Sequence, residues 1–519
     1  MRLQVAHVFL ETKFSLSFRR ANPIILLTLL TAIVLNIFGH LMRPWSNTTL
    51  ELLNLMLKTA LGNPSTMQKS KTELDYVPCD IHSVREKFDL EPSTQTHATC
   101  VRCSCTYLPI IRKKATTYPE RCSFTKYRGS KPCGQLLVKS MKSGNTRIMV
   151  PIRPFIVQDY NEFLASLFSR PGMEAAMECR TRLNDKYQLW DIKDGTGITE
   201  IAGPDSKPFM DGLQRSNLRL AWSLSINWFN PHGNKSAGKK KSVGSIAMAL
   251  LNLPPSLQYK AENLYVVGII PGPKEPSLDE VNHFLHPLVD FFLSAWQNGT
   301  WFTKTVEHPG GRLPRSVIVL AVNDLPAARK VMGFAGPTAA HLCNLCWLEK
   351  SEISNFACET WRVRTCKEYL DAANHWREAV SKAERDKVFK ETGVRWSELL
   401  RLPYWDPTRF LVINGMHNLF LGIVQHHFRD LIIIDKLANQ GLCRFHHFPE
   451  KAVTEEEIQK TRKLLTSGAS ITSLSRIRVV VLLQMVEEHG QLAMLPSSKK
   501  RPTKKSLINV LLVKYKLFG

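Results

Sequence analysis

The chain has 519 residues, 44% of them hydrophobic and 22% charged. The length allows two to four domains with a large buried core, and the ordinary globular composition excludes a fibrous or wholly disordered chain. The formal net charge is +24. So large a basic excess indicates a polyanionic partner, with nucleic acid as the first candidate and a merely solubilising basic surface as the alternative.

Residues 1–95 are expected to form a helical N-terminal region. The run 23–42 is apolar and nearly long enough to span a bilayer, which takes about 20 residues. Two threonines and an asparagine interrupt it, and a second apolar stretch at 50–61 could bury its face. We therefore favour a buried helical hairpin, with a membrane anchor as the alternative.

The cysteines of the next region suggest a metal site. We expect no cleaved signal peptide, and CxxC spacings in a non-secreted protein favour metal binding over disulfides. Thiolates brought together from two loops suit tetrahedral zinc, which can fold a segment with little core. We predict a zinc-ribbon-like module at 96–136 with the ligands Cys100, Cys103, Cys122 and Cys133. Buried or incidental thiols are the alternative.

An α/β core is expected after a helical linker at 137–216. The predicted elements are strands at 220–227, 243–252 and 263–270, a helix at 278–296, a strand at 316–322 and a helix from 326. This is the element order of the ribonuclease H-like fold, which we assign to residues 217–340. There, carboxylates at the ends of the first and fourth strands lie side by side to hold paired metals. Asp324 stands at the fourth-strand position and Asn227 at the first.

Nine sequence blocks, spread over roughly residues 97–435, resemble the transposases of CACTA-type (En/Spm-like) DNA elements. The blocks are NWFNP at 227–231, NKSAGK at 234–239, LNLPP at 251–255, GIIPGPKEP at 268–276, NDLPA at 323–327, CNLC at 343–346, WSEL at 396–399, YWDP at 404–407 and MHNLFLG at 416–422. The resemblance implies a ribonuclease H-like nuclease that uses Mg²⁺ or Mn²⁺ to cut at terminal inverted repeats and join the freed ends elsewhere.

The chain departs from that family at two catalytic positions. Asp324 matches the second catalytic acid, although it could instead cap the following helix. Asn227 and Asn414 stand where the family has aspartate. An amide lacks the negative charge that binds a hard divalent cation, so we expect this copy to be catalytically impaired. The third acid should come from a later helix, for which Glu487 and Glu488 are the nearby candidates.

The resemblance also covers a cysteine pair in a largely helical insertion, which we place at 341–440. Cys343 and Cys346 with His417 form a second predicted zinc site, and a small apolar pair is the alternative. Rival ligands are Cys358 and Cys366.

Basic segments complete the prediction. The DNA-binding loop contains Lys235, Lys239, Lys240 and Lys241, and a basic run at 499–505 resembles a nuclear import signal. Residues 441–519 are expected to be a basic helical tail, cut short at its end. We expect two partners, namely double-stranded DNA that carries the element's terminal repeats and a further copy of this chain. We expect the protein to act in the nucleus. A membrane-anchored protein held by 23–42 is the alternative function.

Overall fold

The structure is a computed structural model that describes twelve segments of the chain. They are residues 4–6, 22–60, 77–88, 90–112, 115–144, 146–178, 191–210, 217–231, 241–431, 453–468, 470–489 and 503–517. The chain divides into two compact units, residues 1–423 and 424–519.

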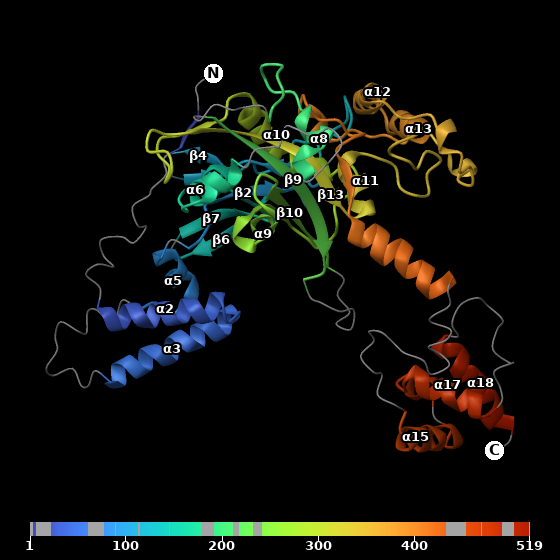
Figure 1. Ribbon diagram of the computed structural model, residues 1–519. Coiled ribbons are helices and arrows are strands. Elements are labelled where there is room, and N and C mark those ends of the chain that lie inside the picture. The colour runs from blue at the N-terminus through green and yellow to red at the C-terminus, as the bar shows by residue number, and fades with distance from the viewer. Residues whose placement is uncertain are drawn as a thin grey trace. The chain divides into compact units, whose positions relative to one another are not determined.

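The N-terminal region contains helices α2 (Pro23–Ile37), α3 (Arg43–Ala60) and α5 (Ile81–Lys87) (Figure 1). The side chain of Asn22 accepts a hydrogen bond from the Ile24 amide at 2.9 Å and so caps α2. Leu29, Leu50 and Val84, one from each helix, share a small core. The predicted hairpin is therefore present, although only one face of each helix is buried. Within the described segments, every helix is too short or too polar to cross a membrane.

The expected helical linker at 137–216 starts as strands, and this part of the prediction is wrong. The strands from the cysteine region onward are β2 (Thr94–Thr99), β3 (Thr106–Tyr107), β4 (Ile110–Arg112), β5 (Ala115–Thr117), β6 (Val138–Ser143), β7 (Thr146–Pro151) and β8 (Pro154–Gln158). β6 pairs with β7, and β8 lies between β11 and β2 in the main sheet. Helical structure begins only with α6 (Tyr160–Phe168), α7 (Met173–Met177), a 3-10 turn (Ile192–Asp194) and α8 (Thr196–Thr199).

The core is an eight-stranded mixed sheet in the order β14-β13-β9-β10-β11-β8-β2-β3. The sheet includes β9 (Asn217–Phe229), β10 (Val243–Leu250), β11 (Leu264–Ile270) and β13 (Leu313–Asn323), with β14 (Leu411–Ile413) at one edge. β10 runs antiparallel to both β9 and β11, whereas β13 is parallel to both β9 and β14. Helix α10 (Val281–Gln297) precedes β13, and α11 (Leu325–Met332) follows it. The predicted strands and helices of this region are thus all present.

The two faces of the sheet differ. One face is covered, with Trp222 of β9 fully buried beside the ring of Tyr160 from α6. The strict alternation of strand side chains places Ser225 and Asn227 on the other face, where both are exposed. Val266 and Ile269 of β11 are exposed as well. The end of β9 therefore presents its polar residues on an open face.

The remaining elements are smaller. Strand β1 (Gln4–Ala6) pairs with β12 (Thr300–Phe302). The helices are α9 (Pro255–Gln258), α12 (Cys366–Glu378) and α13 (Lys382–Thr392). There are 3-10 turns at Ala261–Asn263, Lys350–Glu352, Cys358–Thr360 and Glu398–Arg401, and π-helical turns at Met416–Val424 and His427–Leu431. α12 begins with a capping box in which Thr365 and Glu368 each accept from the other's backbone amide.

The second unit is helical where it is described. It contains α15 (Glu455–Thr466), α16 (Ile471–Leu474), α17 (Val479–Glu488) and α18 (Lys504–Leu517). Leu465, Leu482 and Leu507 belong to its core, which gives this unit a hydrophobic cluster of its own. Glu487 and Glu488, the predicted candidates for a third acid, end α17.

Candidate functional site

The strand register brings three predicted positions into one row. Ala321 of β13 lies opposite Leu224 of β9, so the same register extended by three residues places Asp324 opposite Asn227. On the other side Asn323 lies opposite Ile413, so the next residue pair is Asp324 and Asn414. Beyond the pair Ala321 and Leu224, β13 is connected to β9 through the Asn323 side chain, whose Oδ1 accepts a hydrogen bond from the Ile226 amide. Asn227, Asp324 and Asn414 therefore form a row at the carboxyl ends of three parallel strands, which we call the polar row.

Asn323 connects the three strands directly beneath the polar row. Its Oδ1 accepts a hydrogen bond from the Ile226 amide at 2.6 Å, and its backbone oxygen accepts from the Asn414 amide at 3.0 Å. The side chain is only 2% exposed. Sequence reasoning missed this residue, although an asparagine at the end of the apolar run 317–322 is the kind of buried polar group that needs a partner.

Asp324 also caps the helix that follows it. Its Oδ1 accepts from the Ala327 amide at 2.7 Å at the start of α11. Asn414 does the same for the next helical segment, accepting from the Met416 amide at 2.9 Å. The capping role anticipated for Asp324 is present in the structure. It occupies one oxygen of the carboxylate and holds the residue at the strand end.

The donor set of the polar row limits its chemistry. It contains one carboxylate and two neutral amides. Two divalent cations about 4 Å apart need several negative oxygen ligands to hold them against their mutual repulsion. The residues present do not fit such a pair of Mg²⁺ or Mn²⁺ ions.

A buried lysine lies next to the polar row. Lys330 of α11 donates to Glu275 at 2.7 Å, and its Nζ lies 4.6 Å from the ring centroid of Trp228, the residue after Asn227. This cation is therefore already paired. Of the predicted DNA-binding lysines, Lys241 is exposed just before β10. The other three fall outside the described residues, namely Lys235, Lys239 and Lys240.

The four cysteines predicted as zinc ligands meet in the structure. The Sγ atoms of Cys100, Cys103, Cys122 and Cys133 all lie within 4.8 Å of one another. Cys100 Sγ is 3.7 Å from Cys133 Sγ, and Cys103 Sγ is 3.5 Å from Cys122 Sγ. Four thiols at this separation fit a tetrahedral metal ion such as zinc. The cluster could hold such an ion, in agreement with the prediction.

Neighbouring hydrogen-bond donors reach the sulfur atoms of the four-cysteine cluster. The amide of Arg102 donates to Cys100 Sγ at 3.4 Å, and the Tyr107 hydroxyl lies 3.2 Å from Cys122 Sγ. Burial raises the pKa of the Cys100 and Cys103 thiols. Because a metal binds the deprotonated form, its binding here would release protons. Tyr107 was not anticipated, since nothing in its local sequence marks it.

Polar contacts attach the four-cysteine region to the core. Arg153 Nε donates to the backbone oxygens of Pro271 and Gly272, each at 3.1 Å. Thr106 Oγ1 donates to the backbone oxygen of His283 in α10 at 2.9 Å. The region is thus part of the first unit and supports the segment between β11 and α10.

The second predicted zinc site is not assembled. Cys346 is buried and Cys343 half-buried, and Cys343 Sγ accepts from the Leu345 amide at 3.4 Å. His417 is exposed on the helical turn after β14. Among the described residues, only the four-cysteine cluster groups three or more potential ligand side chains closely enough for an ion. Neither His417 nor the rivals Cys358 and Cys366 complete a site with the pair.

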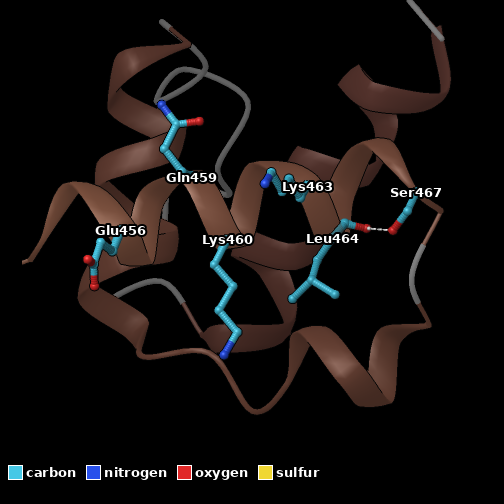
Figure 2. Close-up of a pocket in the computed structure, with 6 residues that line it drawn as sticks. All are labelled: Glu456, Gln459, Lys460, Lys463, Leu464 and Ser467. Carbon is cyan, nitrogen blue, oxygen red and sulfur yellow. Dashed lines mark hydrogen bonds between the residues drawn. The ribbon is translucent and has the colours of Figure 1, made fainter.

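A hollow of about 530 Å³ lies on the second unit (Figure 2). Its lining consists of Glu456, Gln459, Lys460, Lys463, Leu464 and Ser467, all from α15 and its last turn. The Ser467 hydroxyl donates to the Leu464 backbone oxygen at 3.2 Å. Because one helix supplies the whole lining, no polar groups converge from different elements, and none of the predicted site residues lies there.

One segment of the chain matches a known protein family. Residues 208–392 match the model of a family described as Transposase family tnp2. This part of the chain is similar to transposases. The matched segment is less than half of the chain and includes Asn227, Asp324 and the Cys343 pair, whereas Asn414 and the four-cysteine cluster lie outside it. A comparison with curated proteins gives no match. The similarity supports a transposase-derived function.

Proposed function

We propose that this protein is a DNA-binding protein derived from a CACTA-type transposase, with a ribonuclease H-like core that no longer cleaves DNA efficiently. The observation that carries the proposal is the polar row. Its three members come from segments 90 or more residues apart, yet the strand register aligns them at one edge of the sheet. An amide occupies two of the three positions.

The sheet supports a ribonuclease H-like assignment. β9, β10 and β11 form an antiparallel meander, a helix follows, and β13 then lies beside β9 in parallel orientation. This arrangement brings the ends of the first and fourth strands together, which is the requirement of that fold for its catalytic pair. Asn227 and Asp324 occupy those ends.

Charge is the reason to expect impaired catalysis. Asparagine keeps the shape of aspartate and one acceptor oxygen, so the fold around the polar row can persist. It supplies no negative charge to a hard cation, and a single carboxylate binds Mg²⁺ weakly in water. DNA binding does not depend on that charge. The net charge of +24 supplies attraction to phosphates, and the affinity should fall steeply with salt.

The remaining assignments follow from the proposal. Zinc in the four-cysteine cluster would stabilise the fold rather than take part in cleavage. The DNA partner would be a duplex with the terminal repeats of the element, and the protein would act in the nucleus. The apolar N-terminal helices require no membrane role, since none of the described helices can span a bilayer.

The decisive experiment compares two purified full-length proteins on a duplex that carries the element's own ends. One is the chain as written, and the other carries Asn227→Asp and Asn414→Asp. With Mg²⁺ or Mn²⁺, we expect both to bind, with affinities that fall as salt rises, and only the double variant to nick the duplex. A triple variant with Asp324→Asn added is the matched control and should bind without nicking.

Three results would contradict the proposal. Nicking by the unmodified chain would show that the amides do not impair catalysis. Nicking that persists in the triple variant would place the active site elsewhere. Absence of salt-sensitive binding by either protein would remove the DNA-binding role. If all variants bind and none cuts, the missing component is the third acid, and the binding part of the proposal stands.

A further inference from the structure

The N-terminal hairpin exposes an unusual amount of apolar surface. Twelve large apolar side chains between Ile24 and Met56 are between 36% and 75% exposed. Phe38 and Trp45, at 75% and 62%, lie near the turn between the helices. Isolated exposed apolar residues are normal, but twelve of them on two packed helices indicate an interaction surface.

The exposed residues follow a regular spacing on each helix. On α2 the stripe is Ile24, Leu27, Thr31, Val34 and Phe38, and on α3 it is Trp45, Thr48, Leu52, Leu55 and Thr59. Both follow the intervals i, i+3, i+7, i+10 and i+14, which is the spacing of side chains that pack against a neighbouring helix. Each stripe covers the same length, about 21 Å at 1.5 Å per residue. The two stripes therefore match each other in length and period.

The threonines in these stripes do not oppose burial. Thr31 donates its hydroxyl to the Leu27 backbone oxygen at 2.8 Å, and Thr59 donates to that of Leu55 at 2.9 Å. Thr48 donates to Pro44 in the same way at 3.1 Å. Because each hydroxyl is satisfied within its own helix, a partner could cover the stripes without leaving an unpaired polar group.

Few charges lie on the hairpin. Arg43, Glu51 and Lys58 are the only acidic or basic residues, histidine aside, between 22 and 60, and Arg43 forms an ion pair with Asp80 at 2.6 Å. α5 is attached to the hairpin by that pair and by the Ile81 amide, which donates to Asn47 at 2.9 Å. Two copies of so nearly neutral a surface would not repel each other.

We propose that a second copy of this chain covers the hairpin, so that α2 and α3 of two protomers form a four-helix bundle. A twofold arrangement places the same patch on both protomers and lets equal stripes pair with each other. If both stripes are fully covered, their apolar side chains bury on the order of 900 Å² per copy, compared with roughly 800 Å² per partner in a standard interface. The hairpin is thus a dimerisation element, and this inference does not depend on the proposed DNA function.

The test measures the molar mass of the purified full-length chain by light scattering after gel filtration, at tens of micromolar and high salt without DNA. The monomer mass is 59.0 kDa, so a dimer should have twice that mass. Leu27→Glu combined with Leu52→Glu should weaken the dimer at least about 100-fold and give the monomer mass, because charges would be buried at the interface centre. Phe356→Glu, at an 84% exposed site in the insertion, is the control and should leave the dimer intact.

The outcomes distinguish a second copy of the chain from a lipid bilayer as the partner that covers the hairpin. A monomeric unmodified chain would overturn the inference, as would a dimer that the double variant does not disturb. Binding of the unmodified monomer to phosphatidylcholine vesicles, lost in the double variant, would assign the patch to a bilayer instead. Far-ultraviolet circular dichroism checks that the double variant is folded. If it is not, the single variant Leu55→Lys is measured in the same way, and its dimer must dissociate for the inference to stand.

Discussion

Restoring two aspartates in the polar row should make the stability of this protein depend on divalent metal. The variant Asn227→Asp plus Asn414→Asp places three carboxylates at the ends of three adjacent strands. We take the general spacing of paired strands, about 5 Å, as the separation of neighbouring carboxylates. The substitutions are isosteric, so packing should change little. At that distance two unit charges repel by about 1 kcal/mol in water and about 3 kcal/mol at an effective dielectric constant of 20.

The exposure of the three side chains decides which repulsion energy within this range applies. Asn227 is exposed, while Asp324 and Asn414 are half-buried, so each neighbouring pair lies toward the lower end. Two pairs then destabilise the metal-free double variant by on the order of 2–3 kcal/mol, which for a unit as large as residues 1–423 corresponds to a fall in melting temperature of roughly 2–4 °C. Millimolar Mg²⁺ or Mn²⁺ should reverse this fall, because the cations neutralise the repulsion and bind only the folded row.

The assay is thermal unfolding of the full chain in EDTA and in a series of Mg²⁺ concentrations at low salt. The chain as written should show no specific response to Mg²⁺. Asn355→Asp adds one carboxylate at an exposed turn of the insertion and serves as the control, with no response expected. If Mg²⁺ and Mn²⁺ raise the melting temperature of the double variant no more than that of the control, the three side chains do not converge on one site. The reasoning from strand register would then be refuted.

Substitutions at four further residues test individual contacts and one buried histidine. Asn323→Ala should cost about 1–3 kcal/mol in chemical denaturation because it leaves a buried amide unpaired, and a loss below 0.5 kcal/mol would show that the cross-strand bond is unimportant. Asp324→Ala should cost about 1 kcal/mol through the lost cap, whereas Asp324→Asn should be nearly neutral, so equal losses would argue against capping. Cys100→Ser should reduce zinc per chain, measured by atomic emission, from near one to near zero, while Cys358→Ser at an exposed site should not. Burial lowers the pKa of His97 to about 4, so folding should lose on the order of 2 kcal/mol as the pH falls from 6.5 to 4, and a His97→Gln variant with the same pH profile would contradict this.

Local sequence patterns were sufficient for part of this protein. The helices and strands between 217 and 332 were predictable because apolar residues recur there with the period of a helix or in buried runs. The grouping of Cys100, Cys103, Cys122 and Cys133 was predictable in part because Cys100 and Cys103 have the CxxC spacing typical of metal sites. The same reasoning failed at 137–158. Apolar and polar residues alternate only weakly along the short strands of this segment, and these strands gain stability by pairing with other strands.

Tertiary structure decided the rest. The sequence could name Asn227, Asp324 and Asn414, but it could not show that β14, only three residues long, pairs with a strand about 90 residues earlier. It also could not reveal that Asn323 connects these strands, or that His417 lies away from the cysteine pair it was expected to join. Short-range periodicity determines which residues form an element and which face is apolar. Which strands lie side by side depends on the packing of the whole sheet, and that packing places one carboxylate between two amides.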